Sequence, residues 1–291
     1  MDIGKVGVWA PQFRDRDSGK IADVAASVEA DGYKTAWVPG GSGGDLFGDV
    51  DVVLGATERM VVATGVLNVW MHEAADTARW YTKAASRHPD RLLLGLGASH
   101  GVLVEATGRT YAKPLTVLRE YLDALDAAPT PVPGDRRMVA ALGPRMLELA
   151  GARSLGAHPY LTGPEHTRIA REVLGPDALL APELMVVFSA DPGEAREIAR
   201  SGLALYMQLP NYTRNLVRTG FSEADISEVS DRLVDGLVAW GDVEQISAKA
   251  REHWDAGADH VCIQVLTARR EDVPWEAWSE LAPALREAAG V

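Results

Sequence analysis

The sequence predicts an α/β fold, a single (β/α)8 TIM barrel spanning residues 1–291. Short apolar runs rich in β-branched residues alternate with longer amphipathic segments, which is typical of a parallel sheet surrounded by helices. The length of 291 residues suits one such barrel, which commonly needs about 250. Hydrophobic residues make up 47% of the chain and charged residues 24%, so a sizeable core can form without disulfides or metals.

Eight apolar runs are the predicted strands: 3–10, 35–39, 60–67, 91–97, 137–142, 156–161, 183–188 and 260–266. Apolar residues at 21, 24, 25 and 28 predict the first helix, and further helices are expected over about 74–87, 115–127, 144–152, 164–174, 192–204, 243–256 and 275–289. The segment 205–240 interrupts this alternation. We expect it to be a helical insertion, or lid, before the last strand.

Charge and composition exclude several classes of protein. The chain has 41 acidic and 29 basic residues, a net charge of −12, which would repel nucleic acid. The chain shows neither a signal peptide nor an uncharged stretch long enough to span a membrane, so a cytoplasmic protein is expected. The single cysteine, Cys262, lies in an apolar run and is interpreted as a small buried hydrophobic residue.

In a barrel of this kind the loops after the strands carry the chemistry. Trp9, near the end of the first run, and Phe13, just after it, could flank a flat ligand or pack the rim. The second run is followed by the glycine-rich stretch 39–44, which either turns sharply or lets a ligand approach the backbone. This stretch lacks the GxGxxG spacing of a dinucleotide-binding turn.

The third and fourth runs contribute further candidates. Thr64-Gly65 interrupts an apolar strand, and the polar Asn68 follows it, which suggests a bulge or close contact with a ligand. The fourth run ends in small residues before Ser99 and His100. An imidazole can give or take a proton near neutral pH, so His100 is the candidate for proton transfer, with capping or packing as the alternative.

The fifth run leads directly into a helix through Gly143, Pro144 and Arg145. Free N–H groups at such a helix start favour a phosphate. After the sixth run, Thr162 could cap the next helix, and His166 is expected on its solvated first turn. The sequence contains no HExxH or paired-cysteine motif, so no metal site is predicted.

Several of these segments resemble the luciferase-like monooxygenases, and within them the actinobacterial branch that uses the deazaflavin coenzyme F420. The resemblance spans nearly the whole chain and is carried by residues 61–68 (VVATGVLN), 87–97 (RHPDRLLLGLG), 141–150 (ALGPRMLELA) and 256–265 (AGADHVCIQV). Residues 164–167, 209–213 and 238–242 resemble an uncharacterised subgroup of that branch.

The resemblance implies a binding site for coenzyme F420. It implies a non-prolyl cis peptide at Gly65–Val66 behind the central ring of the cofactor, with Asn68 near the polar edge of the ring. The cofactor-binding residues implied in this way are Thr64, Gly65, Val66, Asn68, Gly97, Ala98, Ser99, Gly143, Pro144 and Arg145. The implied reaction is hydride transfer between C5 of the deazaflavin and a small organic substrate. Related barrels often pair as homodimers.

One departure affects the proton-transfer residue. Relatives often carry an acidic residue and a histidine after the second strand, where this chain has Pro39-Gly40-Gly41. His100, His72 and Glu73 remain as candidates, and His100 is preferred.

Two alternative functions stay open. One is an FMN-dependent monooxygenase that uses reduced flavin and oxygen, and the other is a non-catalytic ligand-binding or scaffold relative. The longer deazaflavin tail would favour basic residues at the rim, and Arg14, Lys113 and Arg145 could supply them.

Overall fold

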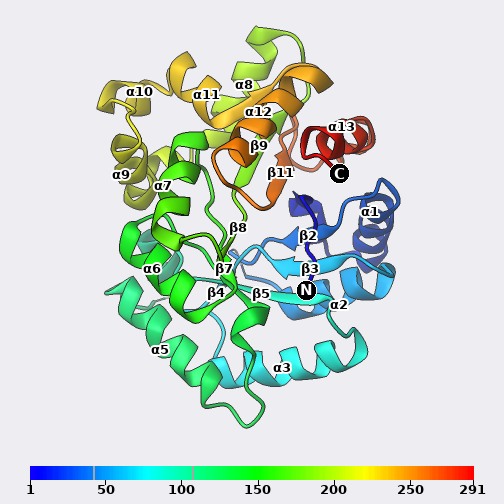
Figure 1. The fold of residues 1–291 in the computed structure, drawn as a ribbon, viewed down its shortest axis with the longest axis vertical. Helices are drawn as coiled ribbons and strands as arrows, with labels where there is room; N and C mark the ends of the chain where they lie inside the picture. The colour runs from blue at the N-terminus through cyan, green and yellow to red at the C-terminus, as the bar shows by residue number, and fades with distance from the viewer. Residues whose placement is uncertain (42, 107) are drawn as a thin grey trace.

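The computed structural model describes residues 1–41, 43–106 and 108–291. Its strands lie at the centre of the molecule, and the helices surround them (Figure 1). In chain order the strands are β1 (Val6–Trp9), β2 (Thr35–Val38), β3 (Val61–Thr64), β4 (Leu67–Asn68), β5 (Leu92–Gly97), β6 (Arg137–Val139), β7 (Gly156–Ala157), β8 (Leu179–Leu180), β9 (Glu183–Val187), β10 (Val238–Trp240) and β11 (Val261–Val265).

The strands form a curled parallel sheet. Its hydrogen-bonded order is β10-β9-β11-β1-β2-β3-β5-β6-β7-β8, and β4 pairs with β5. Only residues 181–182 separate β8 from β9. This stretch bonds to β7 on one side, where Ala181 N donates to Ala157 O at 2.9 Å, and to β11 on the other, where Cys262 N donates to Pro182 O at 2.9 Å. The chain therefore links β8, at one end of the order, to β9 near the other.

Each predicted run contains an observed strand, but the sequence does not predict β8 and β10. The run 60–67 also divides into β3 and the start of β4. Pro182 has no N–H for a strand ladder, which is a local reason why β8 and β9 are separate. β10 pairs with β9, with Val238 opposite Met185, and forms one end of the strand order.

The main surrounding helices are α1 (Ser18–Ala30), α2 (Leu46–Ala56), α3 (Ala74–Arg87), α5 (Pro114–Asp126), α6 (Pro144–Arg153), α7 (Pro164–Leu174), α8 (Pro192–Leu203), α12 (Val243–Asp255) and α13 (Trp275–Ala288). The sequence did not predict α2. The observed α1 contains the predicted apolar positions, and each of the other helices begins and ends within two residues of its predicted range. The valines and glycines of α2 disfavour a helix, yet Asp45 caps it by accepting a hydrogen bond from Gly48 N at 3.0 Å.

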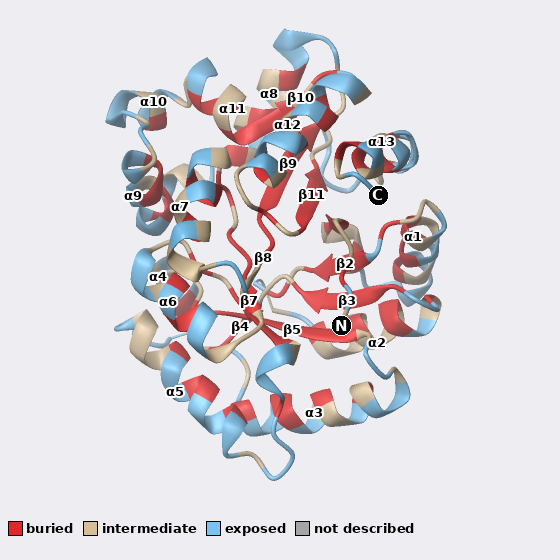
Figure 2. Ribbon diagram, viewed as in Figure 1, coloured by how far each residue is buried: buried red, intermediate tan, exposed pale blue. Residues whose placement is uncertain are grey.

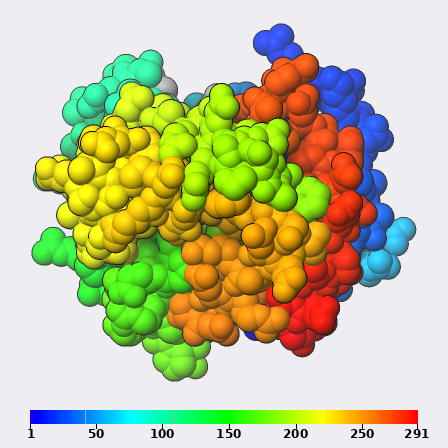
Figure 3. Space-filling model, turned by 90° about the horizontal axis from the view of Figure 1, so that it is seen from above, coloured from blue at the N-terminus to red at the C-terminus, as the bar shows by residue number. Residues whose placement is uncertain are grey.

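The segment 205–240 contains η3 (Tyr206–Gln208), α9 (Pro210–Arg218), α10 (Glu223–Glu228), α11 (Asp231–Leu237) and β10. The view from above shows α8 to α11, coloured yellow-green to yellow, as one continuous surface over this side of the molecule (Figure 3). The prediction of helical pieces in this segment is confirmed.

Burial follows the layers of the fold. The strands are buried along their length, and the helices are buried on their inner faces (Figure 2). Inside the sheet, Trp9, Trp37, Met138 and Cys262 belong to one apolar cluster. Within the described ranges, none of the helices combines the length and the apolar character needed to cross a bilayer.

Candidate active site

The candidate site is built around a cis peptide bond between β3 and β4. The bond joins Gly65 and Val66, as the sequence resemblance implied, and that prediction is confirmed. The indole Nε1 of Trp9, at the end of β1, donates to Gly65 O at 2.7 Å. Trp9 therefore faces the cis peptide inside the sheet, whereas Phe13 is fully buried in the main core between sheet and helices.

Three glycines allow neighbouring segments to approach this peptide. A Cβ atom on Gly40 would lie 2.3 Å from Val66 O, and one on Gly95 would lie 2.0 Å from Thr64 O. A Cβ atom on Gly97 would lie 2.6 Å from Val66 Cγ2. Because two of these contacts are with backbone, side chains at Gly40 and Gly95 would displace the main chain.

The predicted cofactor-binding residues of β3 to β5 lie together. Thr64 Oγ1 donates to Gly95 O at 2.7 Å, and Asn68 pairs with Gly97 in the sheet. The amide oxygen of the buried Asn68 accepts from Trp70 N at 3.0 Å. The sequence therefore correctly grouped Thr64 to Asn68 with Gly97.

The chain after β5 continues along the same edge. Ala98 O accepts from the Trp70 indole at 2.8 Å, and Ser99 O accepts from the Tyr111 hydroxyl at 3.2 Å. Ser99 has φ of 58°, a left-handed conformation that turns the chain sharply toward His100. These bonds hold Ala98 and Ser99 beside β4.

Arg14 differs from its predicted role at the rim. Its guanidinium pairs with Asp49 of α2 and donates to the carbonyl oxygens of Pro39 and Gly43. All three guanidinium nitrogens are thus engaged in fastening the glycine-rich stretch to α2. Ser42, within that stretch, lies outside the described residues. Lys113 and Arg145 are exposed.

Gly143, Pro144 and Arg145 form the start of α6, as predicted. No side chain caps this helix, and no heavy atom lies within 4 Å of where a Gly143 Cβ would stand. His166, expected on a solvated turn, is instead 1% exposed, and its Nε2 lies 2.9 Å from Leu142 O. That contact ties the first turn of α7 to the chain just before Gly143.

A chain of aromatic rings runs from the cis peptide to His100. Ring centroids lie 5.6 Å apart between Trp9 and Tyr160 and 5.4 Å apart between Tyr160 and Tyr206. Tyr206 meets Tyr212 edge to face at 5.4 Å, and Tyr212 lies 5.1 Å from the His100 ring. Segments far apart in sequence, including η3 and α9, therefore meet over the edge that carries the cis peptide.

Hydrogen bonds connect two tyrosines of this ring chain with Gln264 of β11. The Tyr160 hydroxyl donates to Gln264 Oε1 at 2.8 Å and lies 2.7 Å from the Tyr206 hydroxyl. Burial raises the pKa of Tyr160 well above its ordinary value of 10.0 and also raises that of Tyr206. Both phenols stay neutral at physiological pH and act as hydrogen-bonding groups.

His100 precedes α4 (Gly101–Glu105) but does not cap it. Its Nδ1 lies 2.9 Å from Asn211 Oδ1, an acceptor, so Nδ1 carries the hydrogen and Nε2 keeps a free lone pair. Burial lowers the pKa of His100 below 6.5, and the Asn211 bond offsets part of this shift. The imidazole of His100 is therefore mostly neutral at physiological pH.

The two other candidates for proton transfer lie outside the ring chain. His72 packs against Phe47 of α2 at a centroid distance of 4.8 Å, and burial lowers its pKa. Glu73 is exposed at the start of α3 and makes no capping bond there.

Glu183 is a buried carboxyl group inside the sheet that the sequence analysis did not consider. It is 1% exposed, Oε2 accepts from Leu161 N at 3.1 Å, and Oε1 has no hydrogen-bond partner. Burial raises its pKa from 4.5 to about 8. The carboxyl group is therefore mostly protonated at neutral pH.

Metal ligands are not grouped anywhere in the part of the chain that the structure describes: no cluster of three or more His, Cys, Asp or Glu residues could hold an ion. Cys262 is a free, fully buried thiol, which confirms its interpretation as a small core residue.

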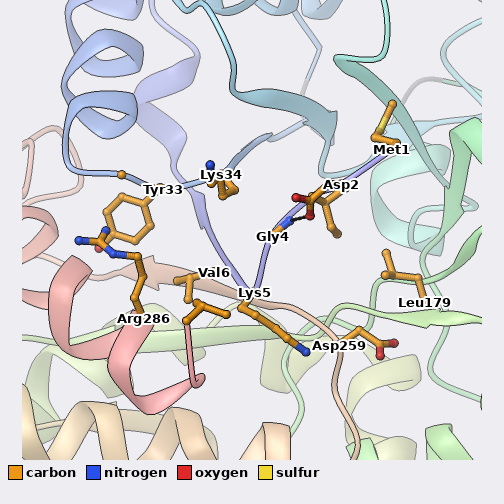
Figure 4. A pocket seen from close by; sticks show the side chains of 13 residues that line it. Met1, Asp2, Gly4, Lys5, Val6, Tyr33, Lys34, Leu179, Asp259 and Arg286 are labelled. Atoms are coloured by element: carbon orange, nitrogen blue, oxygen red, sulfur yellow. Dashed lines mark hydrogen bonds between the residues drawn. The ribbon is translucent and has the colours of Figure 1, made fainter.

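A separate cavity of about 600 Å³ lies at the opposite, amino-terminal ends of β1, β2 and β11. In Figure 4, Tyr33, Lys34 and Arg286 stand on one side of it, and Lys5 and Asp259 on the other. None of the predicted site residues lines this cavity. It is therefore distinct from the candidate active site.

The sequence did not predict the hydrogen-bonded group of Tyr160, Tyr206 and Gln264, although each residue lies in or near a segment considered there. The available signal was polarity: Gln264 is a polar residue within a buried strand, and Tyr160 ends a predicted one. What the sequence could not show is that their hydroxyl and amide groups meet.

Comparison with known families identifies the chain. The sequence profile of the luciferase-like monooxygenases matches residues 5–260. The chain belongs to this family. One curated relative is the 5,10-methylenetetrahydromethanopterin reductase of Methanolobus tindarius, which is 27% identical over 172 residues. The aligned region is 52% of this chain and 53% of the relative. The chain thus aligns with about half the length of that relative.

Solved structures share the fold over nearly the whole chain. An F420-dependent secondary alcohol dehydrogenase, in complex with an F420-acetone adduct, superposes with a TM-score of 0.75 at 14% identity, covering 97% of this chain and 99% of the other. The coenzyme F420-dependent tetrahydromethanopterin reductase of Methanopyrus kandleri gives 0.71 at 15% identity, with 98% and 99% covered.

A flavin enzyme is similar to the same extent. The oxygenating constituent of 3,6-diketocamphane monooxygenase from Pseudomonas putida, in complex with FMN, gives a TM-score of 0.73 at 12% identity, covering 98% of each chain. Structures of both cofactor classes therefore share this fold, and relatives of the chain are oxidoreductases and monooxygenases.

Proposed function

We propose that the protein is a coenzyme F420-dependent oxidoreductase that transfers a hydride between C5 of the deazaflavin and a small organic substrate. The observation that carries this proposal is the enclosure of residues 64–66 by Gly40, Gly95 and Gly97, where the resemblance implied the central ring of the cofactor. The F420-dependent reductase and dehydrogenase among the similar structures support it. When bound, the deazaflavin would supply a carbon centre that exchanges a hydride in a two-electron step.

The residues present fit such a cofactor. Thr64 to Val66, Asn68 and Gly97 to Ser99 would hold its central ring, and the start of α6 would hold its phosphate. The fit at α6 rests on the missing side-chain cap and the open space at Gly143, which leave backbone N–H groups available to an anion. His100 would exchange the substrate proton through its free Nε2.

The proposal extends to the architecture. With β3 and β4 counted as one strand, β8 and β9 as another, and β10 as an addition, the sheet corresponds to an eight-stranded barrel. The segment 205–240 would then be an insertion over the barrel mouth.

An FMN-dependent monooxygenase is the second candidate, and the FMN complex among the similar structures favours it. Both cofactors carry a ribityl phosphate, so the phosphate site alone does not separate them. The longer acidic tail of the deazaflavin separates the two cofactors, because it would reach the exposed Lys113 and Arg145.

The test is equilibrium binding of oxidised coenzyme F420 and, separately, of FMN, followed by fluorescence. We expect micromolar or tighter binding of F420 and weak binding of FMN. The variant Lys113→Glu, away from the start of α6, should weaken F420 about fivefold and leave FMN within about twofold. Lys34→Glu, on the opposite end of the sheet, is the matched control. Preference for FMN would support the monooxygenase, and binding of neither would support a non-catalytic relative.

A further inference from the structure

The cavity at the amino-terminal ends of β1, β2 and β11 has a wall that the sheet holds in place. Residues 3–5, which lead into β1, form this wall. Thr35 Oγ1 donates to Ile3 O at 2.6 Å, and Nδ1 of the fully buried His260 lies 2.8 Å from Gly4 O. Because β2 and the start of β11 fix the backbone in this way, the cavity is formed before a ligand arrives.

The lining of this cavity is mostly apolar. The buried side chains of Ile3, Val6 and Tyr33 contribute to it, together with Leu179 of β8. The Tyr33 hydroxyl donates to Trp278 O at 2.9 Å, so its hydrogen is already in use and its ring serves as wall. A volume of about 600 Å³ lies within the range of about 300–1,000 Å³ that is usual for small-molecule sites. The cavity therefore suits a ligand with an apolar body.

Charged side chains stand on both sides of the cavity (Figure 4). Lys34 and Arg286 lie on one side, and Lys5 lies with Asp259 on the other. Asp259 is paired with Arg171, so its negative charge is compensated from outside the cavity. Cations therefore dominate the charge that a ligand would meet.

The two lysines are the cations available to a ligand. In the part of the chain that the structure describes, neither Lys5 nor Lys34 forms an ion pair. Arg286, by contrast, donates from Nη1 to Asp31 O at 2.7 Å. The remaining carboxylate of the lining, that of Asp2, accepts from the backbone at Gly4 N at 2.8 Å. Unpaired ammonium groups beside an apolar wall match a ligand that joins an anionic group to a hydrocarbon body.

We propose that this cavity binds a small carboxylic acid with an apolar body. The hydrocarbon part lies against the apolar wall, and the carboxylate lies at Lys5 and Lys34. Their flexible four-carbon stems allow the ammonium groups to follow the carboxylate. This site lies at the opposite end of the sheet from the candidate active site, and the inference does not depend on the proposed cofactor.

The test compares octanoate with octanol, which share a chain and differ in charge. Calorimetry on the purified protein should give a dissociation constant of about 0.1 mM for octanoate. Octanol should bind about tenfold more weakly, because partly exposed ion pairs contribute modestly. Methyl NMR locates the ligand: the signal of Ile3, in the cavity wall, should shift, and that of Ile226 in α10 should not.

Variants separate the role of charge from that of packing. The double variant Lys5→Met, Lys34→Met keeps most of both apolar stems and removes both charges. It should weaken octanoate about tenfold and leave octanol within about twofold. Lys83→Met, exposed on α3, is the matched control and should change neither value.

Three results would overturn the proposal: no binding of octanoate, equal affinity for the two probes, or an unchanged octanoate affinity in the double variant. An Ile3 methyl signal that does not move would also overturn it. If Lys113→Glu abolishes octanoate binding and the double variant does not, the acid binds at the candidate active site instead. The affinity for F420 should stay within about twofold in the double variant, and a larger loss would contradict the separation of the two sites.

Discussion

Replacing Glu183 with glutamine is expected to stabilise the protein by an amount that grows with pH. The folded protein holds a proton on this buried carboxyl group up to a pKa of about 8, whereas the ordinary value is 4.5. Between those values the folded chain binds more protons than the unfolded chain, so rising pH favours unfolding. Glutamine keeps an oxygen for the Leu161 N–H and removes the titration.

The size of the effect follows from the two pKa values. One pKa unit corresponds to about 1.4 kcal/mol, so the carboxyl group lowers stability by about 1 kcal/mol near pH 5 and by about 4 kcal/mol near pH 7.5. The stability difference between Glu183→Gln and the parent should therefore increase by about 3 kcal/mol over this interval. Below the unfolded pKa the carboxyl group costs nothing, because both states are protonated.

Urea denaturation of both proteins near pH 5 and near pH 7.5 measures this difference directly. Glu120→Gln, on the exposed face of α5, is the control and should show no comparable trend. A stability difference that stays constant between the two pH values would refute the reasoning, because the carboxyl group would then titrate alike in both states.

Three further outcomes are expected. Arg14→Ala should cost about 2 kcal/mol in urea denaturation and expose residues 39–44 to proteases, because charged hydrogen bonds to Asp49 and two carbonyls are lost. Gly95→Ala should cost about 1 to 3 kcal/mol in thermal or urea unfolding, since its Cβ would lie 2.0 Å from Thr64 O. In His100→Gln, the acid-side fall in activity, expected below the ordinary pKa of 6.5, should disappear.

Each of these three predictions would be contradicted by a specific result. Unchanged proteolysis of Arg14→Ala would mean that the guanidinium does not fasten the glycine-rich stretch. Gly55→Ala in α2, where nothing lies within 4 Å of the added atom, should be neutral or stabilising, and an equal loss there would remove the steric explanation for Gly95. A parent pH profile without an acid-side fall would exclude His100 as the proton acceptor.

Periodicity alone predicted most of the fold because its signals are local. Runs of apolar residues and helical spacing placed a strand in every predicted run and the ends of α3 and α7 as observed. Local patterns do not report elements that tertiary contacts decide. β10 is a strand because it pairs with Met185 to Val187, and α2 is a helix because Leu46, Val50 and Val53 bury one face despite poor propensity.

In the site, too, local features could be predicted from the sequence and contacts between distant residues could not. The cis peptide and the neighbouring Asn68 and Gly97 could be predicted because they lie in contiguous, recognisable segments. Tyr160 meets Tyr206 across 46 residues and Gln264 across 104, and no pattern in one sequence reports such contacts. The basic character of Arg14 was visible in the sequence, but its three partners, Asp49, Pro39 and Gly43, were not.

The close approach of Gly40, Gly95 and Gly97 to the cis peptide limits how this protein could acquire a new specificity. A Cβ atom would collide with backbone at Gly40 and Gly95 and with the Val66 side chain at Gly97, so this part of the site tolerates little variation. The rings of Tyr206 and Tyr212 come from η3 and α9, which stand apart from the sheet. Libraries that aim to change the substrate should therefore leave the glycines untouched and vary the segment that covers them.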